Sequence, residues 1–186
     1  VIDKERALGY KGKCVEPTYH ITEEILRRIE DSAEVENAEF VIVEIGGTIG
    51  EYQNAIFLEA ARQLKLKNQK SVMFVMVSYL PTPTSIGEMK TKPTQNAVSQ
   101  MNSYGVHPNI IIARADMPVD KKRKEKIANM SGLMSADDVI SAPNVSNIYD
   151  VPVNFEKDGL SDRIMNHFGL KAKKKDLKEW RGFLSK

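Results

Sequence analysis

The feature that most constrains the fold is an apolar run that ends in a carboxylate and a glycine-rich turn. Residues Phe40–Val43 are all aromatic or β-branched, which is typical of a strand buried on both faces of a parallel sheet. Glu44 follows, and then a turn that holds Gly46, Gly47 and Gly50. Ligands of open parallel sheets bind just beyond the carboxyl ends of strands, where glycines let the backbone approach closely. Glu44 is therefore placed to hold a metal ion, although the pattern also fits a buried strand whose carboxylate caps the next helix.

Similar apolar runs alternate with helical patterns along the rest of the chain. Besides the run 40–45, we expect strands over 72–80, 109–113 and 138–141. We expect helices that start near 22, 54, 93, 120, 160 and 176, and a loop with at most one short strand over 1–19. Alternation of strands and helices predicts an α/β fold, a parallel sheet with helices on both faces.

Two of these helices have a clear apolar stripe. In the first, Thr22 is expected to be the N-cap, because a threonine hydroxyl can accept a bond from a first-turn amide. Its apolar face is Ile21, Ile25, Leu26 and Ile29. The helix over 54–65 has Ile56, Phe57, Ala60, Ala61 and Leu64 as its buried stripe, the spacing of one helical face.

Composition bounds the class of protein. A chain of 186 residues fits one domain. The net charge is +2, but residues 171–186 hold seven basic and two acidic side chains, so the remainder carries −3. This balance argues against a nucleic-acid binder. One cysteine, Cys14, excludes an internal disulfide framework and favours a reducing, cytoplasmic setting, and no run is long enough to span a membrane.

A lysine- and threonine-rich segment precedes one of the expected helices. Lys90-Thr91-Lys92-Pro93-Thr94-Gln95 lies between a loop that follows a strand and the start of a helix. Two lysines, two hydroxyls and the free amides of a helix start favour an anion site. The alternative is a solvated turn with an ordinary proline in the first helical turn.

Taken together, several motifs resemble the amidoligase (synthetase) domain of the CTP synthase family. The strongest are Glu44-Ile-Gly-Gly-Thr-Ile-Gly and Gly87-Glu-Met-Lys-Thr-Lys-Pro-Thr-Gln. The agreement continues, in order and with family-like spacing, through nearly the whole chain: His20-Ile-Thr, Phe57-Leu-Glu-Ala-Ala-Arg, Pro108-Asn-Ile-Ile-Ile-Ala-Arg-Ala-Asp, Lys124-Glu-Lys-Ile-Ala, Ile148-Tyr-Asp-Val-Pro and Leu177-Lys-Glu-Trp.

The resemblance implies a fold and an activity. The fold would be a three-layer sandwich like that of P-loop NTPases and Rossmann domains, here incomplete. The activity would be that of an ATP-dependent ligase of pyrimidine biosynthesis, a glutamine amidotransferase that makes CTP. In the family, ATP phosphorylates the uracil 4-oxygen of UTP, and glutamine-derived ammonia then displaces the phosphate. Such phosphoryl transfer depends on positioning and charge neutralisation.

The resemblance also implies roles for individual residues. Glu44 would be a Mg²⁺ ligand, and Arg114, Asn144 and Val145 would contact ATP. UTP, and CTP as an overlapping inhibitor, would be held in a pocket shared between the subunits of a homotetramer. The residues implied for that pocket are Glu51, Gln53, Lys90, Thr91, Lys92, Pro93, Thr94, Gln95 and Lys126. Lys90, Lys92 and Lys126 are expected to come together only when neighbouring subunits do.

The sequence departs from the family pattern in several places. No Gly-x-x-x-x-Gly-Lys-Ser/Thr motif occurs in the chain, and we expect the glutaminase domain, which in the family follows the Trp180 region, to be absent as well. We expect 1–170 to be the latter part of a synthetase domain, inactive alone, and 171–186 a basic helix or linker toward a glutaminase domain. Gln53 replaces the second acid of a family pair, and Tyr19 stands where the family has proline before His20.

Three other hypotheses remain at this stage. The chain could be another P-loop-type ATP-dependent ligase or kinase, which the Lys90–Gln95 segment disfavours. It could be a non-catalytic nucleotide-binding or assembly module, which the missing P-loop favours. It could bind nucleic acid through its basic tail, in which case its affinity for DNA or RNA would depend strongly on salt.

Overall fold

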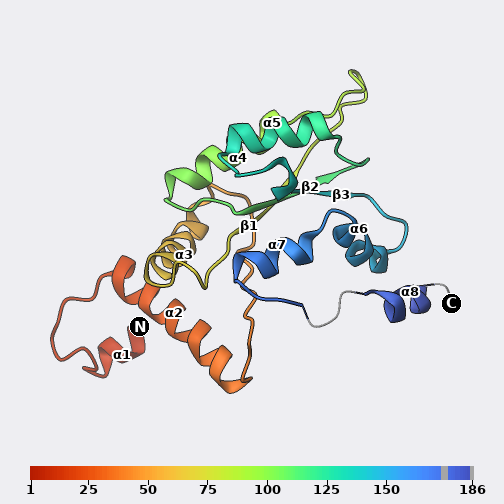
Figure 1. Ribbon diagram of the computed structural model, residues 1–186. Coiled ribbons are helices and arrows are strands. Elements are labelled where there is room, and N and C mark those ends of the chain that lie inside the picture. Colours follow the sequence, from red (N-terminus) through yellow and green to blue (C-terminus); the bar gives the residue numbers. More distant parts are fainter. Residues whose placement is uncertain (173–175, 185–186) are drawn as a thin grey trace. The chain divides into compact units, whose positions relative to one another are not determined.

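The computed structural model describes residues 1–172 and 176–184, and these form two compact units. The first unit comprises residues 1–72 and 103–106, and the second comprises 73–102 and the chain from 107 onward. The expected basic run 173–175 lies outside the described residues. The first unit holds α1 (Ile2–Arg6), α2 (Pro17–Val35) and α3 (Ala55–Lys67) (Figure 1).

The start of α2 corrects two expectations about the first unit. Residues 1–19 are not a loop with a strand, because α1 and the first turn of α2 lie there. Thr22 is not the N-cap: it is fully buried inside α2, and its hydroxyl donates to the carbonyls of Thr18 and Tyr19. Pro17 starts the helix instead, because its fixed φ and missing N–H suit a first turn.

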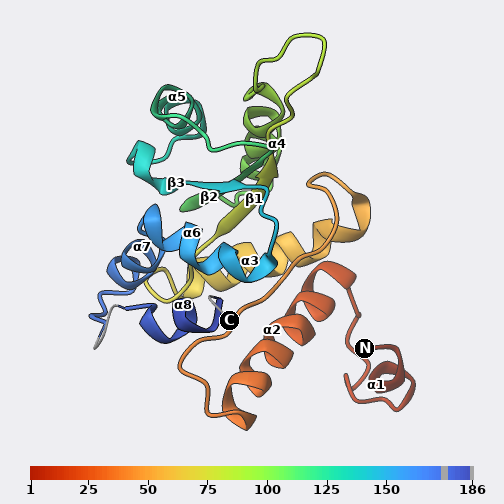
Figure 2. The ribbon, with the colours of Figure 1, turned by 90° about the vertical axis from the view of Figure 1, so that its right-hand side faces the viewer.

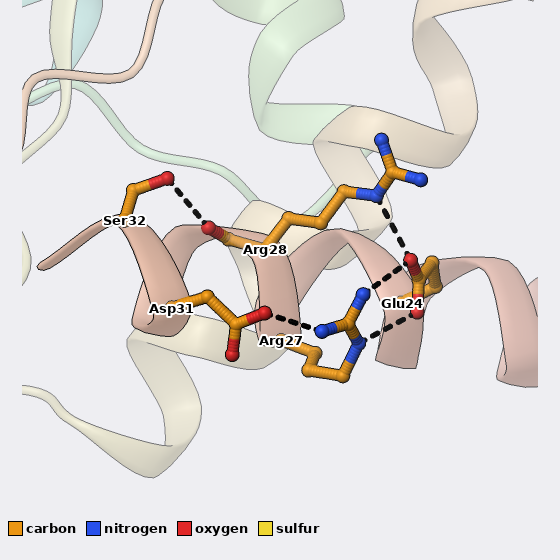
Figure 3. Close-up of polar contacts among 5 residues, drawn as sticks. All are labelled: Glu24, Arg27, Arg28, Asp31 and Ser32. Carbon is orange, nitrogen blue, oxygen red and sulfur yellow. Dashed lines mark hydrogen bonds and ion pairs between the residues drawn. The ribbon is translucent and has the colours of Figure 1, made fainter. Parts of the chain in front are cut away.

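The expected apolar face of α2 is correct, and α2 packs against α3. The opposite face carries an ion-pair network in which Glu24 accepts bonds from Arg27 and Arg28, and Arg27 also pairs with Asp31 (Figure 3). The bonds from Arg27, and then those from Arg28, lower the pKa of Glu24 to about 2. In α3, Leu58 and Ala60 are buried, whereas Phe57, expected in the core, is 45% exposed.

The run 40–45 is not a buried strand. Its backbone forms no β-strand, and Ile42 is 96% exposed. In the part of the chain that the structure describes, no strand pairs with residues 41–45. Because a strand obtains its backbone hydrogen bonds from a neighbour, β-branched composition alone does not produce one.

The second unit is built on a parallel sheet of order β1-β2-β3, as the sequence predicts. The strands are β1 (Val75–Tyr79), β2 (Ile110–Ala115) and β3 (Val139–Pro143). Their register aligns Val77 with Ile112 and Ile112 with Ile140. The central strand β2 and its neighbour β3 supply the core, since Ile111 and Ile140 are both fully buried.

Helices cover both faces of this sheet. α4 (Lys92–Ser103) and α5 (Lys121–Ser131) lie on one face, and α6 (Val151–Lys157) and α7 (Leu160–His167) lie on the other (Figures 1 and 2). Chemical signals in the sequence set their ends: Asp120 caps α5 by accepting a bond from the Arg123 amide, and Gly132 ends it at φ 70°. The chain continues to α8 (Lys178–Leu184). Of these helices, only α6 is not predicted from the sequence.

Candidate functional site

Two neighbouring strands of the second unit end at the same edge of the sheet and present polar side chains there. Arg114 lies near the end of β2, opposite Ala142 of β3, and Asn144 directly follows β3. Arg114 Nη2 donates to Asn144 Oδ1 at 3.1 Å, and Asn144 Nδ2 donates to Asp116 Oδ1 at 3.1 Å. The Asn144 backbone amide is itself bonded to the Ala115 carbonyl at 2.9 Å. These bonds fix the orientation of the Asn144 amide.

A cavity of about 360 Å³ opens at this edge. Its lining comprises Arg114, Ala142, Pro143, Asn144, Val145, Ser146, Ile148, Val151, Asn154 and Phe155. The walls are therefore the end of β3, the loop after it and α6. A mostly apolar cavity with a few convergent polar groups, at the carboxyl ends of parallel strands, is the usual form of a small-molecule site.

The three residues that the family resemblance assigns to ATP, Arg114, Asn144 and Val145, all line this one cavity. Sequence reasoning missed the contribution of α6, including Asn154 and Phe155. The available signal was Pro152, which lies in the first turn of α6 and is typical of a helix start.

An ion pair joins the elements that form the walls of the cavity to α5. Asp158, just after α6, accepts a bond from the Ser141 amide of β3 and another from Lys124 Nζ of α5, both at 2.6 Å. The Lys124 and Asp158 side chains are only 16% and 25% exposed. Ser141 is also bonded through its side chain, because its Oγ accepts a bond from the Val119 amide at 2.9 Å. Asp158 thus connects α6, β3 and α5.

The rim of the cavity is attached to α8. Trp180 Nε1 donates to the backbone carbonyl of Tyr149 at 2.8 Å, and Tyr149 is next to the cavity residue Ile148. The Tyr149 ring also meets those of Trp180 and Phe183 edge-on, with centroids 6.0 and 5.8 Å away. The loop at the cavity mouth is therefore bonded to α8 and packs against it.

The Lys90–Gln95 segment begins α4, as expected, but its threonines face inward. Thr94 is fully buried, and its hydroxyl lies 2.8 Å from Ser78 Oγ of β1. Thr91 is 6% exposed and accepts a bond from Gln95 Nε2 at 3.2 Å. Lys92 and Pro93 are exposed. The Thr94 hydroxyl therefore ties the helix start to β1, whereas the Thr91 hydroxyl makes a bond within the helix start.

Lys90 and Arg123 both pair with Glu88 within one chain. Lys90 Nζ lies 2.9 Å from Glu88 Oε2, and Arg123 Nη2 lies 3.7 Å from Glu88 Oε1. Lys90 first, and then Arg123 and Lys126, hold the pKa of the Glu88 carboxyl below its ordinary value. A long loop thus brings Lys90 to the same carboxylate as Arg123 of α5 within one chain. That Lys90, Lys92 and Lys126 come together when neighbouring subunits do stays a prediction.

The remaining predicted residues lie in the first unit. Glu44 is exposed. The glycine turn after it closes on Glu51, which accepts bonds from the Thr48 amide at 3.1 Å and from Gln53 Nε2 at 2.7 Å. A Cβ at Gly47, whose φ is 87°, would lie 2.7 Å from Glu51 Oε2. Only glycine fits this turn without moving the carboxylate.

The residues that the structure describes include neither a cluster of metal-ligating side chains nor a membrane-spanning helix. Across residues 1–172 and 176–184, no group of three or more His, Cys, Asp or Glu side chains could hold a metal ion. The exposed carboxylate of Glu44 fits Mg²⁺ as a single ligand, because Mg²⁺ commonly takes its other ligands from water and phosphates. No helix among the described residues has the length and apolar character needed to cross a membrane.

Comparison with known proteins finds one family throughout. A family model described as CTP synthase N-terminus matches residues 1–170. The CTP synthase of Pyrococcus abyssi is 41% identical over 187 residues, covering 100% of this chain and 34% of that protein. Those of Methanothermobacter thermautotrophicus and Carboxydothermus hydrogenoformans are 41% and 42% identical, covering 99% and 97% of this chain and 35% and 34% of those proteins. The chain spans about a third of the length of these relatives.

Proposed function

Because the chain belongs to the CTP synthase N-terminal family, we propose that it contributes nucleotide-binding residues to an enzyme that converts UTP to CTP. The overall reaction consumes ATP, phosphorylates the uracil 4-oxygen and replaces that phosphate with ammonia derived from glutamine. The proposal covers the part of the synthetase site that this chain provides.

The cavity at the carboxyl ends of β2 and β3 is the observation that carries this proposal. Its volume of about 360 Å³ falls within the range of small-ligand sites. Arg114, Asn144 and Val145, which were assigned to ATP from the sequence motifs alone, all line it. Residues chosen without the fold thus converge on one cavity in a position where this type of sheet binds ligands.

Each group in the cavity suits one part of a nucleotide. The guanidinium of Arg114 can donate two parallel bonds to a phosphate or ribose oxygen. The Asn144 amide, oriented by Arg114 and Asp116, offers both a donor and an acceptor to a base edge. Val145, Ile148 and Phe155 provide apolar surface for the face of the base. We assign this cavity to ATP.

We assign the UTP side to the other predicted residues. Lys90, Lys92 and Lys126 supply positive charge for a triphosphate, while Thr91 and Thr94 hold the start of α4 in place. Pro93 and Gln95 complete that helix start. In the first unit, Glu51 and Gln53 offer acceptors and a donor for UTP, or for CTP as an inhibitor. Mg²⁺, held partly by Glu44, would neutralise phosphate charge during transfer.

Assembly and location follow from the same family assignment. We propose a cytoplasmic homotetramer in which the UTP site is completed by a neighbouring subunit and a glutaminase domain supplies ammonia. The single cysteine, Cys14, is exposed and free, which is consistent with a reducing compartment.

The test is ATP binding and CTP formation by the wild-type protein and an Arg114→Ala variant, expressed from the complete gene. We expect Arg114→Ala to weaken ATP binding about tenfold or more, because a charge-assisted phosphate contact is lost. The matched control is Lys122→Ala, which removes an exposed charge from α5 and should leave ATP affinity unchanged. Absence of ATP-dependent CTP formation by the wild type, or ATP affinity unchanged in Arg114→Ala, would refute the proposal.

A further inference from the structure

One carboxylate already occupies a group of cations that includes Lys90 and Lys126, two of the three lysines that we assign to phosphate. We define the cationic cluster as Lys90, Arg123 and Lys126. Glu88 lies 2.9 Å from Lys90 Nζ and 3.7 Å from Arg123 Nη2, and Lys126 lies three residues after Arg123 on α5, the spacing of neighbours on one helical face. Asp120 also pairs with Arg123, so three positive and two negative groups meet here, with a net charge of +1.

The backbone next to Glu88 is packed and hydrogen-bonded, whereas the Glu88 side chain is exposed to solvent. Met89 is 5% exposed, and its carbonyl accepts a bond from Arg123 Nε at 3.4 Å. The Lys90 amide donates to the Pro81 carbonyl at 2.8 Å. By contrast, the Glu88 side chain is 58% exposed. The loop can therefore release the carboxylate to solvent without losing the contacts that position Lys90 and Arg123.

We propose that Glu88 is a built-in anion that occupies the cationic cluster in the empty protein and is displaced by the phosphate chain of the bound nucleotide. The proposal rests on the proposed function, because it takes the cluster to be a phosphate site. In the empty state Glu88 satisfies cations that would otherwise repel one another at close range. On binding, the phosphates replace it, and the cost of this exchange sets the affinity.

Charge balance explains why such an exchange favours a polyphosphate. Glu88 carries one negative charge, whereas a nucleoside triphosphate carries several, so the incoming ligand makes more charge-assisted bonds with the same three cations. An anion of low charge gains little over the carboxylate that it must displace. Glu88 thus weakens the binding of every anion that must displace it by about the same factor, so that weakly binding anions are kept out of the cluster while a triphosphate still binds.

The experiment measures binding of inorganic triphosphate and diphosphate to the complete protein by calorimetry at low and high salt. We expect Glu88→Gln to bind both probes about three- to tenfold more tightly at low salt, because a partly exposed ionic competitor is removed, and less so at high salt. The matched control is Glu125→Gln. Glu125 is an exposed glutamate of α5, the helix that carries Arg123 and Lys126, and its replacement should change neither affinity.

The outcomes separate the inference from the proposed function. If the wild type binds triphosphate but Glu88→Gln binds it no more tightly, the inference is wrong and the phosphate site stands. If neither protein binds triphosphate, the cluster is not a phosphate site and both ideas fail. A gain in Glu88→Gln that is much larger for triphosphate than for diphosphate would show that Glu88 stays in place as a fixed charge, which overturns displacement.

A second measurement does not depend on the variant. Carbon-13 NMR of the Glu88 carboxyl follows its titration in the folded wild-type protein. If bound triphosphate displaces Glu88, its depressed pKa should return toward the ordinary value on binding, because its cations are then occupied. A pKa that stays depressed with saturating triphosphate contradicts the proposal.

Discussion

Gln53 Nε2 donates a hydrogen bond to Glu51 Oε2 at 2.7 Å. The same Glu51 carboxylate accepts the Thr48 amide, so the glycine turn closes around one acid that an amide side chain satisfies. In the family pattern the residue at position 53 is an acid. Here the Gln53 amide, which donates a hydrogen bond, stands in place of a second carboxylate. The turn therefore presents one fewer negative charge to a ligand.

The first prediction concerns feedback inhibition. A Glu51 carboxylate bonded to Gln53 has less capacity left for the hydroxyl and amino donors of CTP, and an anionic acceptor bonds such donors more strongly than an amide. We therefore expect weak CTP inhibition in the wild type and stronger inhibition, by about threefold or more, in Gln53→Glu. The measurement is the CTP inhibition constant of the complete enzyme.

The chain offers a close control for this substitution. Gln63 donates to Glu59 at 2.9 Å, so Gln63→Glu introduces the same change next to a different glutamate. Its inhibition constant should match the wild type. An unchanged or weaker inhibition in Gln53→Glu would disprove the link between Gln53 and CTP.

The second prediction is an acid-dependent loss of stability in α3. Bonds from Arg62, and then Gln63, lower the pKa of Glu59 from 4.5 to about 2. A depressed pKa means that the ionised carboxylate stabilises the folded state above pH 4.5, and that this contribution is lost as the pH falls from 4.5 toward 2. Glu59→Gln should therefore be less stable than the wild type at pH 7 and equally stable near pH 2.

Urea unfolding of both proteins at several pH values between 2 and 7 measures this difference. The effect will be modest, because the Glu59 and Arg62 side chains are 31% and 36% exposed and water screens the pair. Glu23→Gln, at an exposed position of α2, serves as the control and should follow the wild type. A stability gap for Glu59→Gln that does not close at low pH would contradict the prediction.

Local patterns were enough to predict the strands of the second unit and its described α-helices other than α6. β2 was predicted from Asn109–Ala113, and α5 from its capping residue Asp120, because caps and apolar runs act over a few residues. The apolar run Phe40–Val43 was misread, since its composition specifies a strand only when a neighbouring strand supplies backbone partners. Thr22 was misread because Pro17, five residues earlier, starts the helix.

The site was partly predictable for a different reason. Arg114 lies in a family-like motif and Asn144 was matched by resemblance, and parallel strands bring their carboxyl ends to one edge; their contact with ATP stays a prediction. The bond from Lys124 to Asp158 joins residues 34 positions apart, and no local pattern encodes it. The convergence of Lys90 and Arg123 on Glu88 was missed for the same reason.

The third prediction concerns the ion pair between Lys124 and Asp158. Asp158→Asn removes the charge that pairs with Lys124 and weakens the bond to the Ser141 amide. We expect a loss of about 2 kcal/mol in the free energy of unfolding, since a largely buried cation is left without its partner. ATP affinity should fall as well, because α6 and β3 both line the cavity and Asp158 joins them.

A double-mutant cycle with Lys124→Gln separates the ion pair from other effects. Urea unfolding of the two single variants and the double variant should give a smaller loss in the double variant than the sum of the single losses. Additive losses would show that the two residues do not interact in solution.

The last prediction uses Trp180, the only tryptophan of the chain, as a reporter. Its indole N–H donates to the Tyr149 carbonyl, and Tyr149 adjoins Ile148 in the cavity wall. A nucleotide that orders this loop changes the bond and the ring contacts around the indole, so ATP should shift Trp180 emission in a saturable way. Arg114→Ala should move the midpoint to higher ATP concentration, whereas Trp180→Phe should abolish the signal. A linear, unsaturable quench that is the same in Arg114→Ala would mean that the cavity and α8 are not coupled, because binding at Arg114 would then leave the indole unaffected.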